Sequence, residues 1–333
     1  MSRHYALTSG IVLALCGSGC DERSEVIARE RAVGEAGSGG EAGLPATGQG
    51  GADTAGQAGA NSSGEAGAPA GGDTGVTRPR FAAPTPVDEL NDPDAKDQDP
   101  TLTADELEIY FFSDRSGNAE IWRATRADTG SPWDPPEPVT EVNSVETDQN
   151  PAISRDGLRL WFSSKREPAG LYFASRPSRD EPFGTPEPIP IDTGDSALLV
   201  IAPSVDEAEL RMAVSIGTAE SRDLYELVRP SLTASWGPPA LVPGVNFDGA
   251  DSTPFLVDDG RELLFHSGRL GLGDLFWAYR ESPGAEVERV EPLGEVNDSV
   301  GFESHPHLTA DRTRLYFGSD RSGNTEIYVA EAL

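Results

Sequence analysis

Cysteine and basic residues are scarce in this sequence. Its 333 residues include two cysteines, Cys16 and Cys20, both near the N-terminus, so the rest of the chain has neither disulfides nor thiolate metal ligands. Lys and Arg number 26 against 56 Asp and Glu, which gives a formal net charge of −30. Phosphate binding relies on clustered Lys and Arg. The composition therefore argues against nucleic acid as a partner and suits basic or cationic partners.

Recognised catalytic motifs are also missing. The chain has no Gly-x-Ser-x-Gly nucleophile elbow and no His-Glu-x-x-His zinc motif. We therefore assign no catalytic residue, no cofactor and no metal, and we expect a protein that is not an enzyme.

The first twenty residues have the pattern of an export signal. A short polar start precedes a mostly apolar run from Ala6 to Leu15, which is too short to cross a bilayer as a helix. The run ends in the letters GSGC at residues 17–20, which resemble the lipobox of bacterial lipoprotein signals. That resemblance implies a signal peptide over residues 1–20, with Cys20 lipidated as the first residue of the mature protein.

Position 17 leaves one alternative open. Gly17 stands where the lipobox has Leu or another aliphatic residue, so an ordinary secretory signal cut near the same place is the second interpretation. Both place the protein outside the cytoplasm. Lipidation would anchor it to the cell envelope, facing the periplasm or the cell surface, and this lipid is the only membrane contact we expect.

Residues 21–77 have the composition of a flexible tether. The segment is built mainly of Gly, Ala and small polar residues, with no aromatic residue. It cannot bury enough apolar surface to offset the entropy of ordering, so we expect it to be disordered. A coil of this length would span roughly 40 Å.

The remaining chain is a fivefold repeat. The letters SDRSGNAEIWRA at 113–124 return almost unchanged as SDRSGNTEIYVA at 319–330. Prolines set the register between these two copies, at Pro100, Pro151, Pro203, Pro254 and Pro306. A regular period of about 50 residues indicates repeated structural units, here near 99–147, 148–199, 200–250, 251–302 and 303–333.

Each unit has the pattern of a four-stranded sheet. Apolar residues recur nine and eleven positions after every proline, which marks one face of a buried strand. These residues are Ile109, Leu160, Met212, Leu263 and Leu315, then Phe111, Phe162, Val214, Phe265 and Phe317. A Gly-containing hairpin and a third strand follow, and an aromatic-then-proline pattern marks the fourth.

The last unit stops short, and the start of the repeat region supplies what it lacks. The chain ends at Leu333, directly after a third strand. The fourth-strand pattern instead appears at residues 80–91, before the first proline, where Phe81 precedes Pro86 and Leu90. We therefore predict an all-β, five-bladed β-propeller over residues 78–333, closed by an N-terminal strand that completes the C-terminal blade.

These units resemble the TolB-type WD40-like β-propeller repeats. The resemblance rests on Pro151 to Gly157, on Leu160 to Ser163, and on Ser319 to Tyr328, and it covers about residues 80–333. It implies the propeller fold. Repeats of this type serve in many proteins outside the cytoplasm, so it does not specify a function.

Acidic and polar residues recur just before the prolines. The first strand of a propeller blade runs beside the central axis, and alternate residues of a strand share a side. We therefore predict a binding site at one mouth of the channel for a cation, a basic peptide or a sugar. Its candidate residues are Asp97, Asp99, Asp148, Asn150, Asp251, Glu303, His305 and His307.

Two alternatives accompany this prediction. The acids three positions before each proline could instead cap loops by accepting backbone hydrogen bonds within each blade. His305 and His307 are spaced to share a face, but no third ligand is demanded by the spacing, so we predict no metal site. The acids of the channel mouth are of the type that binds divalent cations, but nothing else in the sequence supports a bound cation.

The sequence as a whole indicates an exported envelope lipoprotein. We expect its propeller to act, as a monomer, as a non-enzymatic binding or scaffolding module for an unidentified protein or glycan of the envelope. The alternative is a glycan-binding or glycoside-cleaving propeller that uses acids at the channel mouth.

Overall fold

The computed structural model describes residues 76–218, 221–271 and 273–333. Cys20, the signal peptide and most of the tether lie outside the described residues. The described residues form strands and no helix, so none of them forms a helix that could cross a membrane.

The strands form five antiparallel sheets of four. The first sheet contains β2 (Asp97–Leu102), β3 (Glu108–Ser113), β4 (Glu120–Thr125) and β5 (Glu137–Pro138). The second contains β6 (Asp148–Ile153), β7 (Arg159–Ser164), β8 (Gly170–Ser175) and β9 (Glu187–Ile189). The third contains β10 (Leu199–Val205), β11 (Arg211–Gly217), β12 (Arg222–Val228) and β13 (Ala240–Leu241).

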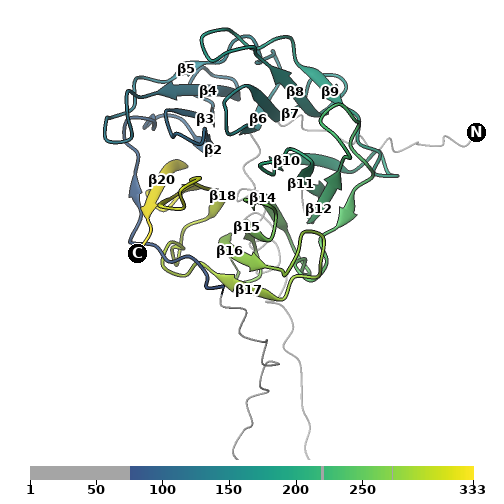
Figure 1. Ribbon diagram of the computed structural model, residues 1–333. Coiled ribbons are helices and arrows are strands. Elements are labelled where there is room, and N and C mark those ends of the chain that lie inside the picture. Colours follow the sequence, from purple (N-terminus) through teal and green to yellow (C-terminus); the bar gives the residue numbers. More distant parts are fainter. Residues whose placement is uncertain (1–75, 219–220, 272) are drawn as a thin grey trace, which may run out of the picture.

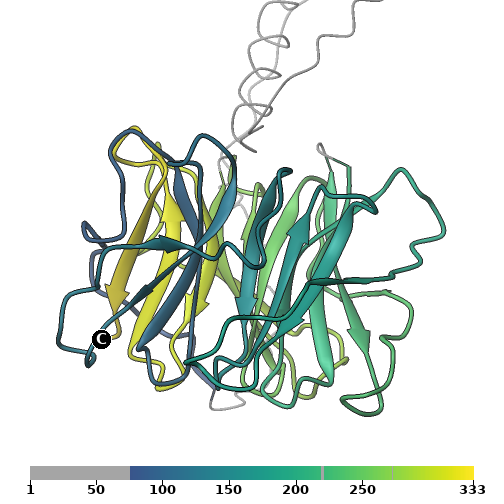
Figure 2. The same cartoon turned by 90° about the horizontal axis from the view of Figure 1, so that it is seen from above.

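The last two sheets follow the same order, except for the final strand. The fourth sheet contains β14 (Asp251–Val257), β15 (Glu262–Ser267), β16 (Asp274–Tyr279) and β17 (Arg289–Pro292). The fifth contains β18 (Glu303–Leu308), β19 (Arg314–Ser319), β20 (Glu326–Glu331) and β1 (Thr85–Pro86). The sheets are arranged as blades around one axis, with β2, β6, β10, β14 and β18 innermost (Figure 1). Figure 2 shows the blades standing side by side around the ring.

The ring closes as the sequence predicted. β1 pairs antiparallel with β20, with Thr85 opposite Val329 and Pro86 opposite Tyr328. Phe81 forms a further bridge to Ala332, and its side chain is 1% exposed in the core of the last blades. The N-terminal strand therefore covers an edge of β20 that would otherwise be free to pair with another chain.

The recurrent prolines mark a β-bulge in every innermost strand. In β2, Gln98 lies opposite Phe112 and Thr101 opposite Tyr110, so Asp99 and Pro100 together face a single residue of β3. The other four blades show the same shift in register. Proline has no N–H to donate, so it is suited to the unpaired position of a bulge. The sequence period is therefore the period of this bulge.

Neighbouring blades are joined by apolar contacts and by charge pairs. Five apolar clusters each join two neighbouring blades. Among the described residues, each blade interface also carries an ion pair. The pairs are Glu108–Arg176 (2.7 Å), Arg159–Glu209 (2.7 Å), Glu226–Arg280, Glu262–Arg312 (2.8 Å) and Glu106–Arg314.

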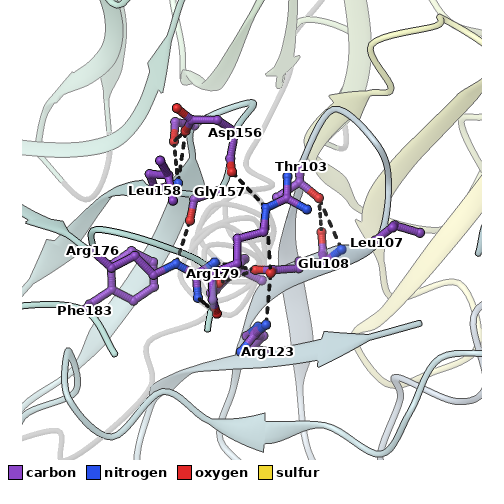
Figure 3. A network of polar contacts seen from close by, with 12 residues as sticks. Thr103, Leu107, Glu108, Arg123, Asp156, Gly157, Leu158, Arg176, Arg179 and Phe183 are labelled. Carbon is purple, nitrogen blue, oxygen red and sulfur yellow. Dashed lines mark hydrogen bonds and ion pairs between the residues drawn. The ribbon is translucent and has the colours of Figure 1, made fainter. Parts of the chain in front are cut away.

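Figure 3 shows the pair between the first and second blades, where Arg123, Arg176 and Arg179 converge around Glu108. Recurrent arginines at the ends of third strands, which include Arg176, thus contribute to the architecture of the ring.

Candidate functional site

A cavity of about 280 Å³ lies on the axis, and residues of all five innermost strands line it. At one end it is bounded by the residue that precedes each recurrent proline. These residues are Asp99, Asn150, Ala202, Thr253 and His305. We call them the mouth ring.

The mouth ring has an unusual backbone conformation. All five residues have a positive φ, between 50° and 61°. None is glycine, and this conformation costs a non-glycine residue roughly 1 kcal/mol. It is imposed by the bulge, which turns these residues out of the ladder and toward the axis. The mouth ring is thus a product of the repeat, and only its side chains differ between blades.

Three members of the mouth ring contact one another across the cavity. The Oδ2 atom of Asp99 accepts hydrogen bonds from the backbone N (3.0 Å) and the Nδ2 atom (2.9 Å) of Asn150. The same Nδ2 atom lies 3.0 Å from His305 Nε2. Because Nε2 faces an amide donor, a neutral His305 ring carries its proton on Nδ1. That nitrogen lies 2.9 Å from Ser304 Oγ and 2.9 Å from Asp99 Oδ1.

Two oxygens of this group have no hydrogen-bond donor among the described residues. They are Asp99 Oδ1 and Asn150 Oδ1, and both are buried. His305 Nδ1 is near Asp99 Oδ1, but the contact lacks the angles of a hydrogen bond. Flipping the Asn150 amide would not help, because its oxygen would then face the Asp99 carboxylate. The parent side chains are 2% and 6% exposed and line the cavity. Buried acceptors of this kind are rare and call for a donor.

His307 lies deeper in the cavity wall than the mouth ring. Its Nε2 atom accepts a hydrogen bond from the Leu102 backbone N at 3.3 Å, and its ring packs 4.6 Å from Phe255. Burial lowers the pKa of His307 to about 3, and the positive charge of Arg155 acts in the same direction. His307 is therefore a neutral, structural part of the wall at neutral pH.

The lowered pKa of His307 predicts an acid-sensitive contribution to stability. Its folded pKa lies below the ordinary value of 6.5, so the unfolded chain binds the proton first as the pH falls. The contribution is present above pH 6.5 and is lost as the pH falls toward 3. We expect the free energy of unfolding of the wild type to decline relative to His307→Gln by about 2 kcal/mol between pH 6.5 and pH 5. Urea unfolding of both proteins at several pH values measures this, and parallel curves would contradict it.

The structure corrects part of the predicted binding site. The four acids three positions before the prolines do not line the cavity. Each is 0% exposed inside its blade. The bulge lies between these acids and the mouth ring, so the expected alternation of side chains is broken and the two sets do not share a side. The acids displaced in this way are Asp97, Asp148, Asp251 and Glu303.

Each of these acids instead holds a loop and an arginine, as the loop-capping alternative described. Asp148 accepts hydrogen bonds from Ser144 N (2.6 Å) and from Arg166 Nη2 (2.6 Å). Arg166 Nε donates in turn to Ser164 Oγ at 2.8 Å. We call this arrangement of acid, serine and arginine the blade clamp. Burial raises the pKa of Asp97 and of Glu303 even though each faces an arginine.

The end of the cavity opposite the mouth ring is charged, and sequence reasoning missed it. Arg155 Nη2 lies 3.0 Å from Asp258 Oδ1, and Arg312 Nη1 lies 3.2 Å from Asp258 Oδ2. Arg155 belongs to the second blade and Asp258 to the fourth, so their contact crosses the ring between blades that are not neighbours. Arg155 and Asp258 each lie four positions after a recurrent proline, and this shared repeat position is the signal that could have located them.

Four further carboxylate residues line the cavity, Asp156, Asp206, Glu207 and Glu209, and two of them have a shifted pKa. Burial raises the pKa of Glu209, while hydrogen bonds, first from Ser154, hold that of Asp156 below its usual value despite partial burial. Both bind the same guanidinium, that of Arg159, at 2.7 and 2.8 Å. Both carboxylates are therefore engaged in an ion-pair network. Across the described residues, no three potential metal ligands of the His, Cys, Asp and Glu types cluster together.

Comparisons with known proteins address the fold. No family model matches the sequence, and no curated protein matches it. An α-L-arabinofuranosidase from Podospora anserina is 12% identical with a TM-score of 0.57, over 77% of this chain and 97% of that one. A putative glycoside hydrolase from Parabacteroides distasonis is 13% identical with a TM-score of 0.52, over 76% and 97%. The chain is a five-bladed β-propeller.

TolB is also among the structures to which this propeller is similar. A putative TolB from Agrobacterium tumefaciens is 16% identical with a TM-score of 0.47, over 75% of this chain and 86% of that one. At these identities the likeness concerns the fold, and the site has to be judged on its own residues.

Proposed function

We propose that this propeller is a non-enzymatic binding module of the cell envelope, and that its cavity receives a cationic group of a protein partner. The observation that carries this is a pair of buried acceptors at the mouth ring, Asp99 Oδ1 and Asn150 Oδ1, that receive no hydrogen bond from the described residues. A buried acceptor left without a donor costs about 1–3 kcal/mol, more for a charged group. A ligand that supplies donors removes that cost.

The charge of the site favours an ammonium or guanidinium group over a neutral one. Asp99 is the one carboxylate of the mouth ring. The chain as a whole carries a formal charge of −30, which would draw a cationic segment toward it. A cavity of about 280 Å³ has room for one side chain or an amino terminus.

The arrangement of carboxylates supports binding over glycoside cleavage. Glycosidases use two carboxyl groups on either side of the scissile bond. Around Asp99, the equivalent positions carry Asn150, Ala202, Thr253 and His305, so the mouth ring offers no second carboxylate. Farther along the cavity, Asp156 and Glu209 are both paired with Arg159. We also propose that the protein is exported and anchored by a lipid on Cys20, on the basis of the signal-like pattern of residues 1–20.

Neutralising Asp99 tests the proposal. Isothermal titration with the tripeptide Gly-Lys-Gly, amidated at its C-terminus, should show binding to the wild type. The variant Asp99→Asn should bind at least roughly tenfold more weakly, which corresponds to about 1.4 kcal/mol. Its thermal midpoint should be measured alongside, because Asp99 also accepts hydrogen bonds from Asn150.

Asp259→Asn provides the matched control. It removes the same charge from an exposed acid that pairs with Arg261 outside the cavity. An equal loss of affinity in both variants would mean that only net charge matters and would overturn the proposal. Binding of neutral oligosaccharides without binding of the peptide, or release of reducing ends from them, would favour the glycan alternative instead.

A further inference from the structure

A second candidate site becomes visible when the five blade clamps are compared. In four blades the arginine of the clamp lies over the aromatic residue of the third strand, 4.9–5.0 Å from its ring centroid. These pairs are Arg115–Trp122, Arg166–Tyr172, Arg269–Phe276 and Arg321–Tyr328. The fold thus has a standard slot for a guanidinium on an aromatic face.

The third blade keeps the aromatic residue and loses the clamp. Tyr225 lies opposite Val214, where the other blades have their aromatic pair. Val200 replaces the acid, Ile216 the serine and Thr218 the arginine. Val200 lies directly opposite Ile216 in the ladder, so two polar partners have become one apolar pair. In the described part of the chain no arginine lies over the Tyr225 ring.

A pocket of about 240 Å³ opens at this place. Tyr225 and Ile216 line it, together with Leu198, Pro238, Pro239 and residues 192–194. In the other blades the arginine donates to a backbone carbonyl nine or ten positions before the proline, as Arg166 does to Val142. Counting back from Pro203 gives Thr193 and Gly194, which line the pocket. The pocket therefore coincides with the slot that an arginine fills elsewhere.

The surroundings of the slot are more open than those of the other blades. The apolar cluster between the second and third blades has eight partly buried members, including Tyr225, Leu198 and Trp236, while the other clusters have at most two. Leu199 and Leu241 nearby are 47% and 53% exposed. A partner that binds here would bury new apolar surface.

We propose that the third-blade slot binds a lysine or arginine side chain of a partner protein. The clamp arginines of the other four blades indicate where the cation would lie, on the face of the Tyr225 ring. Because the clamp acid is absent, Ile216 and Leu198 give the slot apolar surface that suits the aliphatic stem of such a side chain. Asp192 also lines the slot, and its carboxylate, which accepts a hydrogen bond from Gly194 N, supplies a negative charge for the cation. This site is separate from the mouth ring and does not depend on the function proposed for it.

Fluorine NMR of the full chain labelled with 3-fluorotyrosine can test the slot. Tyr225 is one of seven tyrosines, and its signal is assigned by its loss in Tyr225→Phe. Titration with Nα-acetyl-arginine amide should shift the Tyr225 signal saturably, with a Kd of the order of 1 mM, and leave the other tyrosines in place. Thr218→Arg should abolish this shift, because it returns an intramolecular arginine to the slot.

Asp192→Asn should weaken binding several-fold, and Asp180→Asn serves as its matched control because Asp180 is exposed elsewhere in the second blade. The Asp192 variant also keeps the test valid if Thr218→Arg does not fold. No shift of the Tyr225 signal, or an unchanged shift in both Thr218→Arg and Asp192→Asn, would overturn the proposal. A shift with methyl β-D-xylopyranoside and none with the arginine amide would assign the slot to sugars and equally overturn it.

Discussion

Replacing Glu108 by glutamine is expected to lower the free energy of unfolding by about 3 kcal/mol. Glu108 is 4% exposed and accepts a hydrogen bond from Arg176 Nη2 at 2.7 Å (Figure 3). It accepts another from the Tyr110 hydroxyl at 2.8 Å. Its Oε1 atom also lies 3.0 Å from Arg123 Nη2. The Arg176 side chain is 3% exposed, so the substitution leaves a buried cation without its counter-charge.

Chemical denaturation measures this loss. Two further variants test whether it comes from the buried charge pair. Asp259→Asn breaks an ion pair whose side chains are 57% and 55% exposed, and it should cost less than about 0.5 kcal/mol. In the double variant Glu108→Gln with Arg176→Met, the loss should be smaller than the sum of the single losses, since both charges are removed together. A loss below about 1 kcal/mol in Glu108→Gln would show that the pair is not what holds these blades together.

Truncating Phe81 to alanine is expected to cost about 3–5 kcal/mol and to loosen the closure of the ring. Its side chain is 1% exposed and packs with Leu293, Val296 and Tyr328 in the cluster between the last two blades. Phe81 N also lies 3.3 Å from Glu295 Oε1, so the segment is fixed to the fourth blade by side chain and backbone. Removing the ring leaves a cavity at the place where the two ends of the repeat meet.

Leu333→Ala is the matched control for Phe81→Ala. Leu333 lies at the same junction, but its side chain is 82% exposed, so the change should be close to neutral. Hydrogen exchange should locate the effect of Phe81→Ala, with faster exchange in β20 and β1 than in the second and third blades. Uniform acceleration around the ring would contradict a closure role for Phe81.

The architecture of this protein could be derived from the sequence because repetition multiplied weak signals. One aromatic-then-proline pattern near Phe81 would mean little alone. Compared with the same pattern at Trp133, it identified the strand that pairs with Glu326–Glu331. The absence of a clamp in the third blade could also have been predicted from the sequence. At the three repeat positions where the other blades have an acid, a serine and an arginine, the third has Val200, Ile216 and Thr218.

The candidate site was harder to derive, because one bulge changes which way side chains point. Asp97 and Asp99 are two residues apart and would share a side in a regular strand. The positive φ of Asp99 breaks that alternation, so Asp99 lines the cavity and Asp97 is buried against Arg115. The sequence contained the proline that causes the bulge, but not the register of the strand opposite it.

The sequence alone determined the number of blades, their strand order and the closure of the ring, because these follow from periodic apolar burial and from the place where the last period is cut short. Tertiary structure alone decided which polar residues meet. Asp99, Asn150 and His305 come from three blades, up to 206 positions apart, and only closure of the ring brings them within hydrogen-bond distance. Contacts across an axis depend on the fold of every blade at once, and so no local pattern encodes them.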